Sequence, residues 1–179
     1  KVAAEKGCDT AWTTFSYTLV AALLSGFFFL QSNVVIVGIA FLVFMSFLNS
    51  ISFSTMTIAR MNALKYVPTG IAFPIMRLST AIVVLFGLLY YGETLTAMQW
   101  IGVVLALATG LLLTRNNHRP ENVPADKFRI GVILSLLALI GSDGATITGT
   151  IAVRAGDVMA FLGITYLLST FYSLGVVKF

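Results

Sequence analysis

The sequence predicts an all-α integral membrane protein with six visible transmembrane helices. Of its 179 residues, 58% are hydrophobic and only 10% are charged, whereas a soluble domain carries about 25% charged residues. Six apolar segments approach the roughly 20 residues that a helix needs to cross a bilayer. Runs such as 81–89 and 130–140 do not alternate between apolar and polar residues, as the strands of a membrane barrel do. The composition excludes a disordered chain, and the single cysteine, Cys8, excludes a disulfide scaffold.

The predicted helices begin at residues that commonly begin helices. Their ranges are 11–31, 34–58, 67–90, 97–114, 129–150 and 158–177. Asp9 and Asp157 stand where a side chain caps the first and the last of them. Pro68 lies in the first turn of the third, where proline is tolerated, and Thr96 and Gln99 form a capping box for the fourth. Each helix satisfies its own backbone hydrogen bonds in lipid.

Positive charges are concentrated on one side of the predicted membrane. Side 1 is defined as the side that carries the residues before the first helix, and side 2 as the opposite side. Six crossings place nine basic residues on side 1: Lys1, Lys6, Arg60, Lys65, Arg115, Arg119, Lys127, Arg129 and Lys178. Side 2 receives only Arg154. Basic residues in short loops favour the cytoplasmic side, so we predict that side 1, with the polar linker 115–128, is cytoplasmic.

Two segments of the chain resemble each other. Residues 2–9 and 151–157 both run small residues, a basic residue, Gly and Asp into a helix with a tyrosine in its first half, Tyr17 or Tyr166. This pattern predicts two copies of about five helices each, with the second copy inverted, as in secondary transporters. Residues 1–114 then form the first copy without its first helix, 115–128 a linker, and 129–179 the start of the second copy. We expect both ends to belong to a longer protein.

The stretch 59–114 resembles a known family. Its motif residues are ALKYVP at 63–68, Pro74, LFGLLYYGE at 85–93, Gln99, Gly102 and GLLL at 110–113. This is similar to the end of an EamA-type repeat of the drug/metabolite transporter (DMT) superfamily. The resemblance implies a ten-helix inverted-repeat carrier with a central substrate site and alternating access. It also implies an outer location for the linker 115–128, where the charge distribution predicts the inside; for this chain we follow the charges.

Two ionisable residues lie within predicted helices, Arg77 and Asp143. Such residues cost about 2.5–3.5 kcal/mol on insertion scales and are therefore candidate functional residues. The rise of the helices places them at depths that differ by about 6 Å, which an arginine side chain can span. Two interpretations remain open: a substrate or proton site that faces a cavity, or a structural ion pair that locks two helices.

The helix 34–58 carries a polar face, with neighbours three, four or seven residues apart. Its members are Ser46, Asn49, Ser50, Thr57 and Arg60. Of these, Ser46, Asn49 and Thr57 are candidate substrate-binding residues together with Arg77 and Asp143. Such a face either lines a water-filled path or joins helices through hydrogen bonds. Helix 129–150 offers Thr146, Thr148 and Thr150 with the same two interpretations.

A second group of residues is predicted to be structural: Pro74, Gly92, Glu93, Gly102, Ala106 and Gly110. Pro74 is expected to kink its helix, Gly92 belongs to a tight link, and the Glu93 carboxylate favours the start of the next helix. The last three recur every fourth residue, and small residues at this spacing allow close helix packing. A homodimer through this face is one expected consequence.

The function predicted from these observations is secondary transport of a small metabolite, amino acid or drug-like molecule by alternating access, in the direction of efflux. The expected partners are the lipid bilayer and a small-molecule substrate, without nucleic acid, and the expected location is a bacterial plasma membrane. No cofactor, metal site or catalytic constellation is predicted, and we expect no enzymatic activity. The alternatives are an intramembrane lipid-modifying enzyme and a non-transporting membrane subunit.

Overall fold

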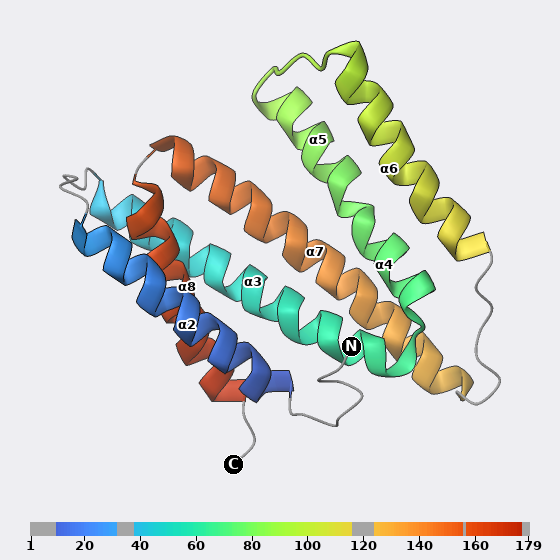
Figure 1. Cartoon of the computed structure of the whole chain (residues 1–179), viewed down its shortest axis with the longest axis horizontal. Helices are drawn as coiled ribbons and strands as arrows, with labels where there is room; N and C mark the ends of the chain where they lie inside the picture. The colour runs from blue at the N-terminus through green and yellow to red at the C-terminus, as the bar shows by residue number, and fades with distance from the viewer. Residues whose placement is uncertain (1–9, 32–37, 116–123, 156, 177–179) are drawn as a thin grey trace.

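The computed structural model of the chain describes residues 10–31, 38–115, 124–155 and 157–176. Within these ranges the structure consists of α2 (Thr10–Gln31), α3 (Ile39–Tyr66), α4 (Thr69–Arg77), α5 (Ser79–Tyr90), α6 (Ala97–Arg115), α7 (Ala125–Ala155) and α8 (Val158–Val176), with no strand (Figure 1). Five spans are long and apolar enough to cross a membrane, counting α4 and α5 as one. In α6 the described apolar stretch, Ala97–Thr109, is shorter. The predicted all-α membrane class is confirmed.

The helices form two groups around a central pair. Helices α3 and α7 pack along each other in the middle, α2 packs on α8 beside them, and α8 also contacts α3 (Figure 1). On the other side of the pair, α4 and α5 pack on α7, and α6 packs on α4 and α5. The hairpin made of α4, α5 and α6 is therefore anchored to the central pair mainly through α7.

Contacts at the helix ends identify the two sides of the bundle. At one end, Thr10 at the start of α2 donates a hydrogen bond to Asn62 near the end of α3 at 3.4 Å. At the other end, Arg154 near the end of α7 forms an ion pair with Glu93 in the link between α5 and α6. These ends correspond to side 1 and side 2 of the sequence prediction, and the helices alternate between them in the predicted order (Figure 1).

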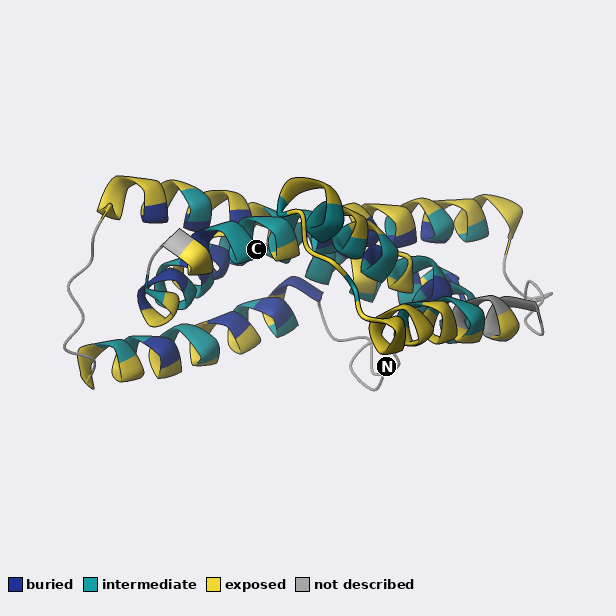
Figure 2. Cartoon of the chain, turned by 90° about the horizontal axis from the view of Figure 1, so that it is seen from above, coloured by how far each residue is buried: buried dark blue, intermediate teal, exposed yellow. Residues whose placement is uncertain are grey.

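The interior of the bundle is rich in hydroxyl groups. Buried residues follow the inner faces of the helices, and exposed residues follow the outer faces (Figure 2). The largest fully buried side chains are all Ser or Thr: Thr14, Thr18, Thr165, Ser46, Ser54, Ser135, Ser169 and Ser173. Large apolar side chains such as Leu23, Leu30 and Leu89 are exposed instead. This distribution suits a lipid environment, in which small polar residues mediate helix packing.

Glycines allow α7 to approach α3 closely. A Cβ atom added at Gly141 would lie 2.8 Å from the carbonyl oxygen of Ser52 and 3.0 Å from the backbone nitrogen of Met56. One added at Gly144 would lie 2.8 Å from the hydroxyl oxygen of Ser52. The Gly-Ser-Asp-Gly segment that contains Asp143 is therefore a helix contact as well as a candidate site.

Two helices are longer than the sequence indicated. The predicted 34–58 helix begins at Ile39, after Gly38 with φ of 73°, and continues past Arg60 to Tyr66; residues 34–37 lie outside the described ranges. It ends because Val67 precedes Pro68 and takes an extended conformation, as residues before proline prefer. The predicted 129–150 helix extends over Ala125–Ala155. Charged residues at both ends were predicted as loop, although they are compatible with helix once they lie near the water interface.

The third predicted helix is broken, and the break lies after Pro74. Helix α4 continues through Pro74 to Arg77, and α5 begins at Ser79. At the junction the Leu78 N–H donates to the Ile75 carbonyl at 3.2 Å, one residue closer than in an α-helix. The predicted kink thus takes the form of a junction about one turn beyond the proline.

Capping residues behave as their sequence positions indicate. Gln99 accepts a hydrogen bond from the Thr96 N–H at 2.8 Å, and Thr96 accepts one from the Gln99 N–H at 3.4 Å. This confirms the predicted capping box. Asp157 accepts a hydrogen bond from the Ala160 N–H at 2.7 Å, which confirms the cap of α8. The predicted cap Asp9 lies outside the described residues.

Candidate functional site

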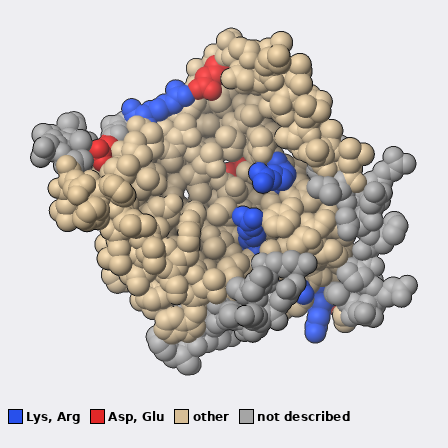
Figure 3. Space-filling model, viewed as in Figure 1, with Lys and Arg blue, Asp and Glu red and all other residues tan. Residues whose placement is uncertain are grey.

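A pair of adjoining cavities, here called the central hollow, lies where α3, α4, α5, α6 and α7 meet. The smaller cavity has a volume of about 200 Å³ and is lined by Met56, Arg60, Phe73, Met76, Arg77, Ser79, Thr80, Ala138 and Ser142. The larger has a volume of about 530 Å³ and is lined by Arg60, Phe73, Pro74, Arg77, Thr80, Ala106 and Thr109. Arg60, Phe73, Arg77 and Thr80 line both. Figure 3 shows separate basic patches near the middle of this face, with a small acidic patch beside one of them.

Two arginines from different helices face the central hollow. Arg60 comes from α3 and Arg77 from the last turn of α4. The Arg60 guanidinium lies 5.1 Å from the centroid of the Phe73 ring, a distance at which a cation is attracted to the ring face. Within the described ranges, neither arginine has a carboxylate oxygen within 4.0 Å. The positive charges of the hollow are therefore not neutralised by ion pairs with this part of the chain.

Asp143 lies behind the wall of the hollow. Its side chain is buried, and its Oδ1 atom has no hydrogen-bond partner in the described structure. The Ser79 side chain lies next to the carboxylate and donates a hydrogen bond to the Ser142 hydroxyl at 3.2 Å. Ser79 and Ser142 both line the smaller cavity. Asp143 and Arg77 thus approach the same region from α7 and α4, without the direct ion pair that was one of the two interpretations.

The remaining candidate binding residues on α3 line neither cavity. Asn49 donates from Nδ2 to the Ala145 carbonyl at 2.5 Å and to the Thr148 hydroxyl at 2.9 Å, both on α7. Ser46 donates to the Phe161 carbonyl of α8 at 3.4 Å. Thr57 donates to the Phe53 carbonyl of its own helix at 2.9 Å. Ser46 and Asn49 therefore join α3 to its neighbours.

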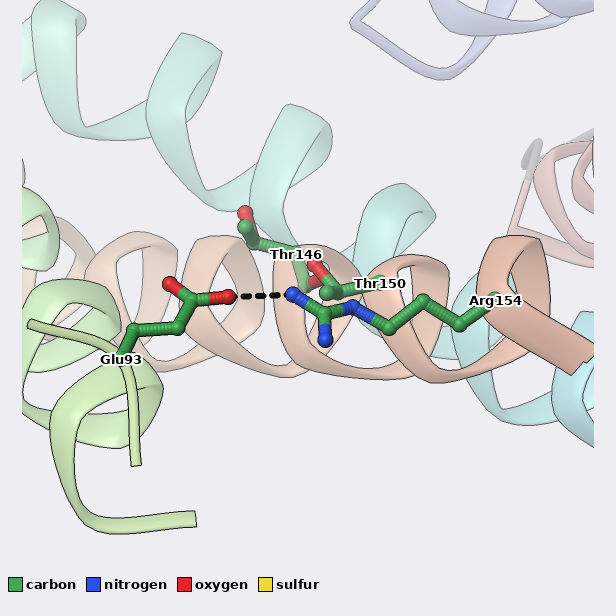
Figure 4. Close-up of polar contacts among 4 residues, drawn as sticks. All are labelled: Glu93, Thr146, Thr150 and Arg154. Carbon is green, nitrogen blue, oxygen red and sulfur yellow. Dashed lines mark hydrogen bonds and ion pairs between the residues drawn. The ribbon is translucent and has the colours of Figure 1, made fainter. Parts of the chain in front are cut away.

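A row of polar side chains runs along α7 from the hollow to side 2. Ser142, Thr146, Thr150 and Arg154 recur every fourth residue and therefore lie on one helix face. Thr146 donates to the Ser142 carbonyl at 2.9 Å and Thr150 to the Thr146 carbonyl at 2.8 Å. In Figure 4, Thr146 and Thr150 lie beside the ion pair of Arg154 with Glu93. These four residues are called the α7 polar row.

A charged contact lies at the side-2 end of the row. The Arg154 guanidinium pairs with the Glu93 carboxylate and lies 3.8 Å from the centroid of the Tyr91 ring. Gly92, between these two residues, has φ of 62°, a conformation that favours glycine. Its backbone turns the link so that Tyr91 and Glu93 both reach Arg154. Glu93 was predicted as structural; in the structure its carboxylate joins the link to α7, while Thr96 caps α6.

The predicted small-residue face of α6 has no close neighbour at Gly102. A Cβ atom added at Gly102 would meet nothing within 4 Å. Ala106, one turn later, lines the larger cavity, and the surroundings of Gly110 lie outside the described residues. Pro74, which was predicted to bend its helix, is buried and lines the larger cavity.

Sequence reasoning missed several residues of the hollow. Ser79 and Thr80 follow Arg77 after one intervening residue, Leu78, at the helix junction, and Ser142 directly precedes Asp143. The signal that could have identified them is the presence of hydroxyl residues beside a charged residue in otherwise apolar segments. Of the α7 polar row, Thr146 and Thr150 were singled out from the sequence as polar helix residues and Arg154 was counted among the loop charges, but Ser142 was not selected.

Comparison with protein families shows to which family the chain belongs. The model of the EamA-like transporter family matches residues 1–115. The chain belongs to the EamA-like transporter family. This family is part of the DMT superfamily, which confirms the resemblance seen in the sequence. The match to the EamA-like family ends at the residue where α6 ends, and it includes both arginines of the hollow and Glu93. Neither the curated proteins nor the solved structures include a significant match.

Proposed function

We propose that the protein is a secondary carrier that moves a small molecule through the central hollow and along the α7 polar row by alternating access. The observation that carries this proposal is the continuity of the two features. Ser142 lines the hollow and begins the row, and Arg154 ends the row in an ion pair with Glu93. In a membrane, a polar path of this kind is costly unless it faces water or substrate.

The positions of the hollow and of the Glu93–Arg154 contact support a conformation in which the hollow is accessible from side 1. Arg77 lies eight positions beyond Thr69, or about 12 Å into its helix at 1.5 Å per residue. The hollow is therefore near the side-1 half of the bundle, and the contact between Glu93 and Arg154 closes the side-2 end of the row. The alternate state would separate Glu93 from Arg154 and narrow the hollow.

A further feature supports a ten-helix carrier with two inverted repeats. The predicted repeat pairs Tyr17 of α2 with Tyr166 of α8. These two rings contact each other edge to face, with centroids 6.5 Å apart. The helices run antiparallel, because Thr170 bonds to Thr18 whereas Gly163, earlier in α8, lies beside Ser25, later in α2. Around a two-fold axis, a residue near the axis meets its own equivalent, as these tyrosines do.

The proposal is tested by filling the hollow. Thr80 lines both cavities, and Thr80→Leu adds apolar volume and removes the hydroxyl. We expect at least a tenfold loss of transport of any active compound from a metabolite panel, measured in vesicles from cells that express the protein. Thr94→Leu in the exposed side-2 link is the matched control and should retain transport. Unchanged transport in Thr80→Leu at equal membrane insertion would contradict the proposed path.

A further inference from the structure

We infer that the substrate of the proposed carrier is an organic anion, a compact molecule with one negatively charged group, bound between Arg60 and Arg77. This inference rests on the proposed function and adds the chemical class of the substrate. Its basis is the convergence of two guanidinium groups, from α3 and α4, on one hollow.

The two arginines lie at similar depths. Arg60 precedes the end of α3 at Tyr66 by six positions, and Arg77 follows the start of α4 at Thr69 by eight. At 1.5 Å per residue, the backbones of both residues lie about 9–12 Å from the side-1 turn that joins these helices. Because both arginines also line both cavities, we place the anionic group between them, where each guanidinium presents several donors in a fixed plane.

Neither arginine is paired with a carboxylate of the described residues, and both side chains are exposed where they line the hollow. Two like charges that face the same hollow repel each other, and a cation within a membrane bundle is normally paired or hydrated. Asp143 does not serve this purpose, since it forms no ion pair with Arg77, and its buried side chain lines neither cavity. An anionic ligand would reduce the repulsion between the two arginines without displacing a protein carboxylate.

The other walls indicate the rest of the ligand. Met56, Phe73 and Met76 present apolar surface to the smaller cavity. Ser79 and Thr80, in the first turn of α5, present hydroxyl groups, and the start of a helix carries partial positive charge that favours anions. An anionic head group beside the arginines and a small apolar or aromatic body against Phe73 fit this combination.

The test uses three probes of one shape and different charge. Benzoate, benzamide and benzylamine are titrated against the purified protein in lipid nanodiscs, with phenyl phosphate as a second anion. We expect at least one of the two anions to bind at least tenfold more tightly than benzamide, and benzylamine to show no specific binding. Arg60→Ala and Arg77→Ala should each weaken binding of that anion at least tenfold and leave benzamide unaffected. Arg129→Ala, an exposed arginine on α7 that lines neither cavity, is the matched control.

Three results would overturn the inference. Neither anion binds, benzamide binds as tightly as the anions, or neither arginine substitution changes the affinity for the anion. Arg77→Lys distinguishes loss of the positive charge from misfolding as the cause of weaker binding. It retains the charge and should retain part of the affinity. The transport assay distinguishes this failure from failure of the proposed function. If Thr80→Leu abolishes transport of a neutral or cationic compound, the carrier proposal stands and the anion assignment is wrong. If the anion binds as expected but Thr80→Leu transports normally, the hollow is an anion site outside the transport path.

Discussion

Arg154, one residue before the end of α7, and Glu93, in the link between α5 and α6, form the ion pair that joins these elements at side 2. Both side chains are about half exposed, and ion pairs of this kind contribute about 0–1 kcal/mol to stability. The contact is therefore weak enough to open during a transport cycle. It contributes little to stability, but it links α7 to the segment between α5 and α6.

Breaking this contact should affect access more than stability. We expect Arg154→Ala to lower the free energy of unfolding by about 1 kcal/mol or less. A cysteine at Thr150 should react faster with thiol reagents from side 2 in the Arg154→Ala background, because the end of the α7 polar row is no longer covered. The exchanged pair Glu93→Arg with Arg154→Glu should restore slow labelling. Equal labelling rates in all backgrounds would show that the ion pair does not control access.

Arg77 and Asp143 should behave as independent residues. The structure shows no ion pair between them, so Arg77→Ala and Asp143→Ala should each insert and fold while transport is lost. Removing one partner of a buried ion pair would instead cost about 3–5 kcal/mol, and the double variant would recover much of that loss. We expect the double-mutant coupling energy to stay below about 0.5 kcal/mol, measured by thermal or denaturant unfolding in detergent.

Asp143 should carry the coupling to protons if the carrier uses a proton gradient. Asp143→Asn retains the shape of the side chain but cannot gain or lose a proton. We expect this variant to exchange substrate across vesicle membranes and to lose accumulation driven by a pH gradient. Asp126→Asn, at the exposed start of α7, is the control and should retain both activities. If the variant loses both substrate exchange and accumulation, Asp143 is instead needed for substrate binding or for folding.

The glycines of α7 should be sensitive to an added methyl group. Gly141→Ala would place a Cβ atom 2.8 Å from the Ser52 carbonyl oxygen, and overpacking of this kind costs about 1–3 kcal/mol. Gly102→Ala on α6 is the matched control, because nothing lies within 4 Å of its added Cβ atom. It should leave the free energy of unfolding unchanged or raise it by up to about 1 kcal/mol, since alanine favours helix. Equal stability of the two variants would contradict the close α3–α7 contact.

The predicted orientation can be tested with cysteines on described residues. In a Cys8→Ser background, a cysteine at Asp126 near side 1 should resist impermeant thiol reagents added outside intact cells. A cysteine at Thr94 in the side-2 link should react. The reverse pattern would place side 1 outside, as the family resemblance implied, and would show that the nine basic residues do not set the topology.

Much of the fold followed from local properties of the sequence. Apolar segment length predicted the helices, and hydrogen-bonding side chains such as Thr96 and Asp157 predicted two of their starts. Local properties did not predict the helix end correctly where a helix continues beyond its apolar segment. Helix α3 continues past Arg60, whose side chain reaches the hollow while the backbone remains helical. The position of the break at Leu78 was also not predictable, since Pro74 disfavours regular helix over a whole turn and packing selects where the discontinuity falls.

The candidate site was only partly accessible to sequence reasoning. Arg77 and Asp143 could be selected because charge in an apolar helix is unusual. The grouping of Arg60 with Arg77, and of Arg154 with Glu93, depends on contacts between residues far apart in the chain, for which neither periodicity nor spacing gives information. The polar face of α3 shows the converse: one face contains Asn49, which holds α7, and Arg60, which lines the hollow.

The hydroxyl-rich interior has a consequence for how the helices can slide. Thr14 and Thr18 of α2 each donate to a carbonyl one turn earlier in their own helix, as Ser25 does. Displacement of α2 along α8 would break the hydrogen bond from Thr170 to Thr18, but these bonds within α2 would remain, and Thr170 also bonds to the Tyr166 carbonyl of its own helix. Asn49, by contrast, bonds across to α7 beside the glycine contacts, and sliding there would break its hydrogen bonds and cause collisions. Relative displacement is therefore less costly between α2 and α8 than between α3 and α7, which would move together as one unit.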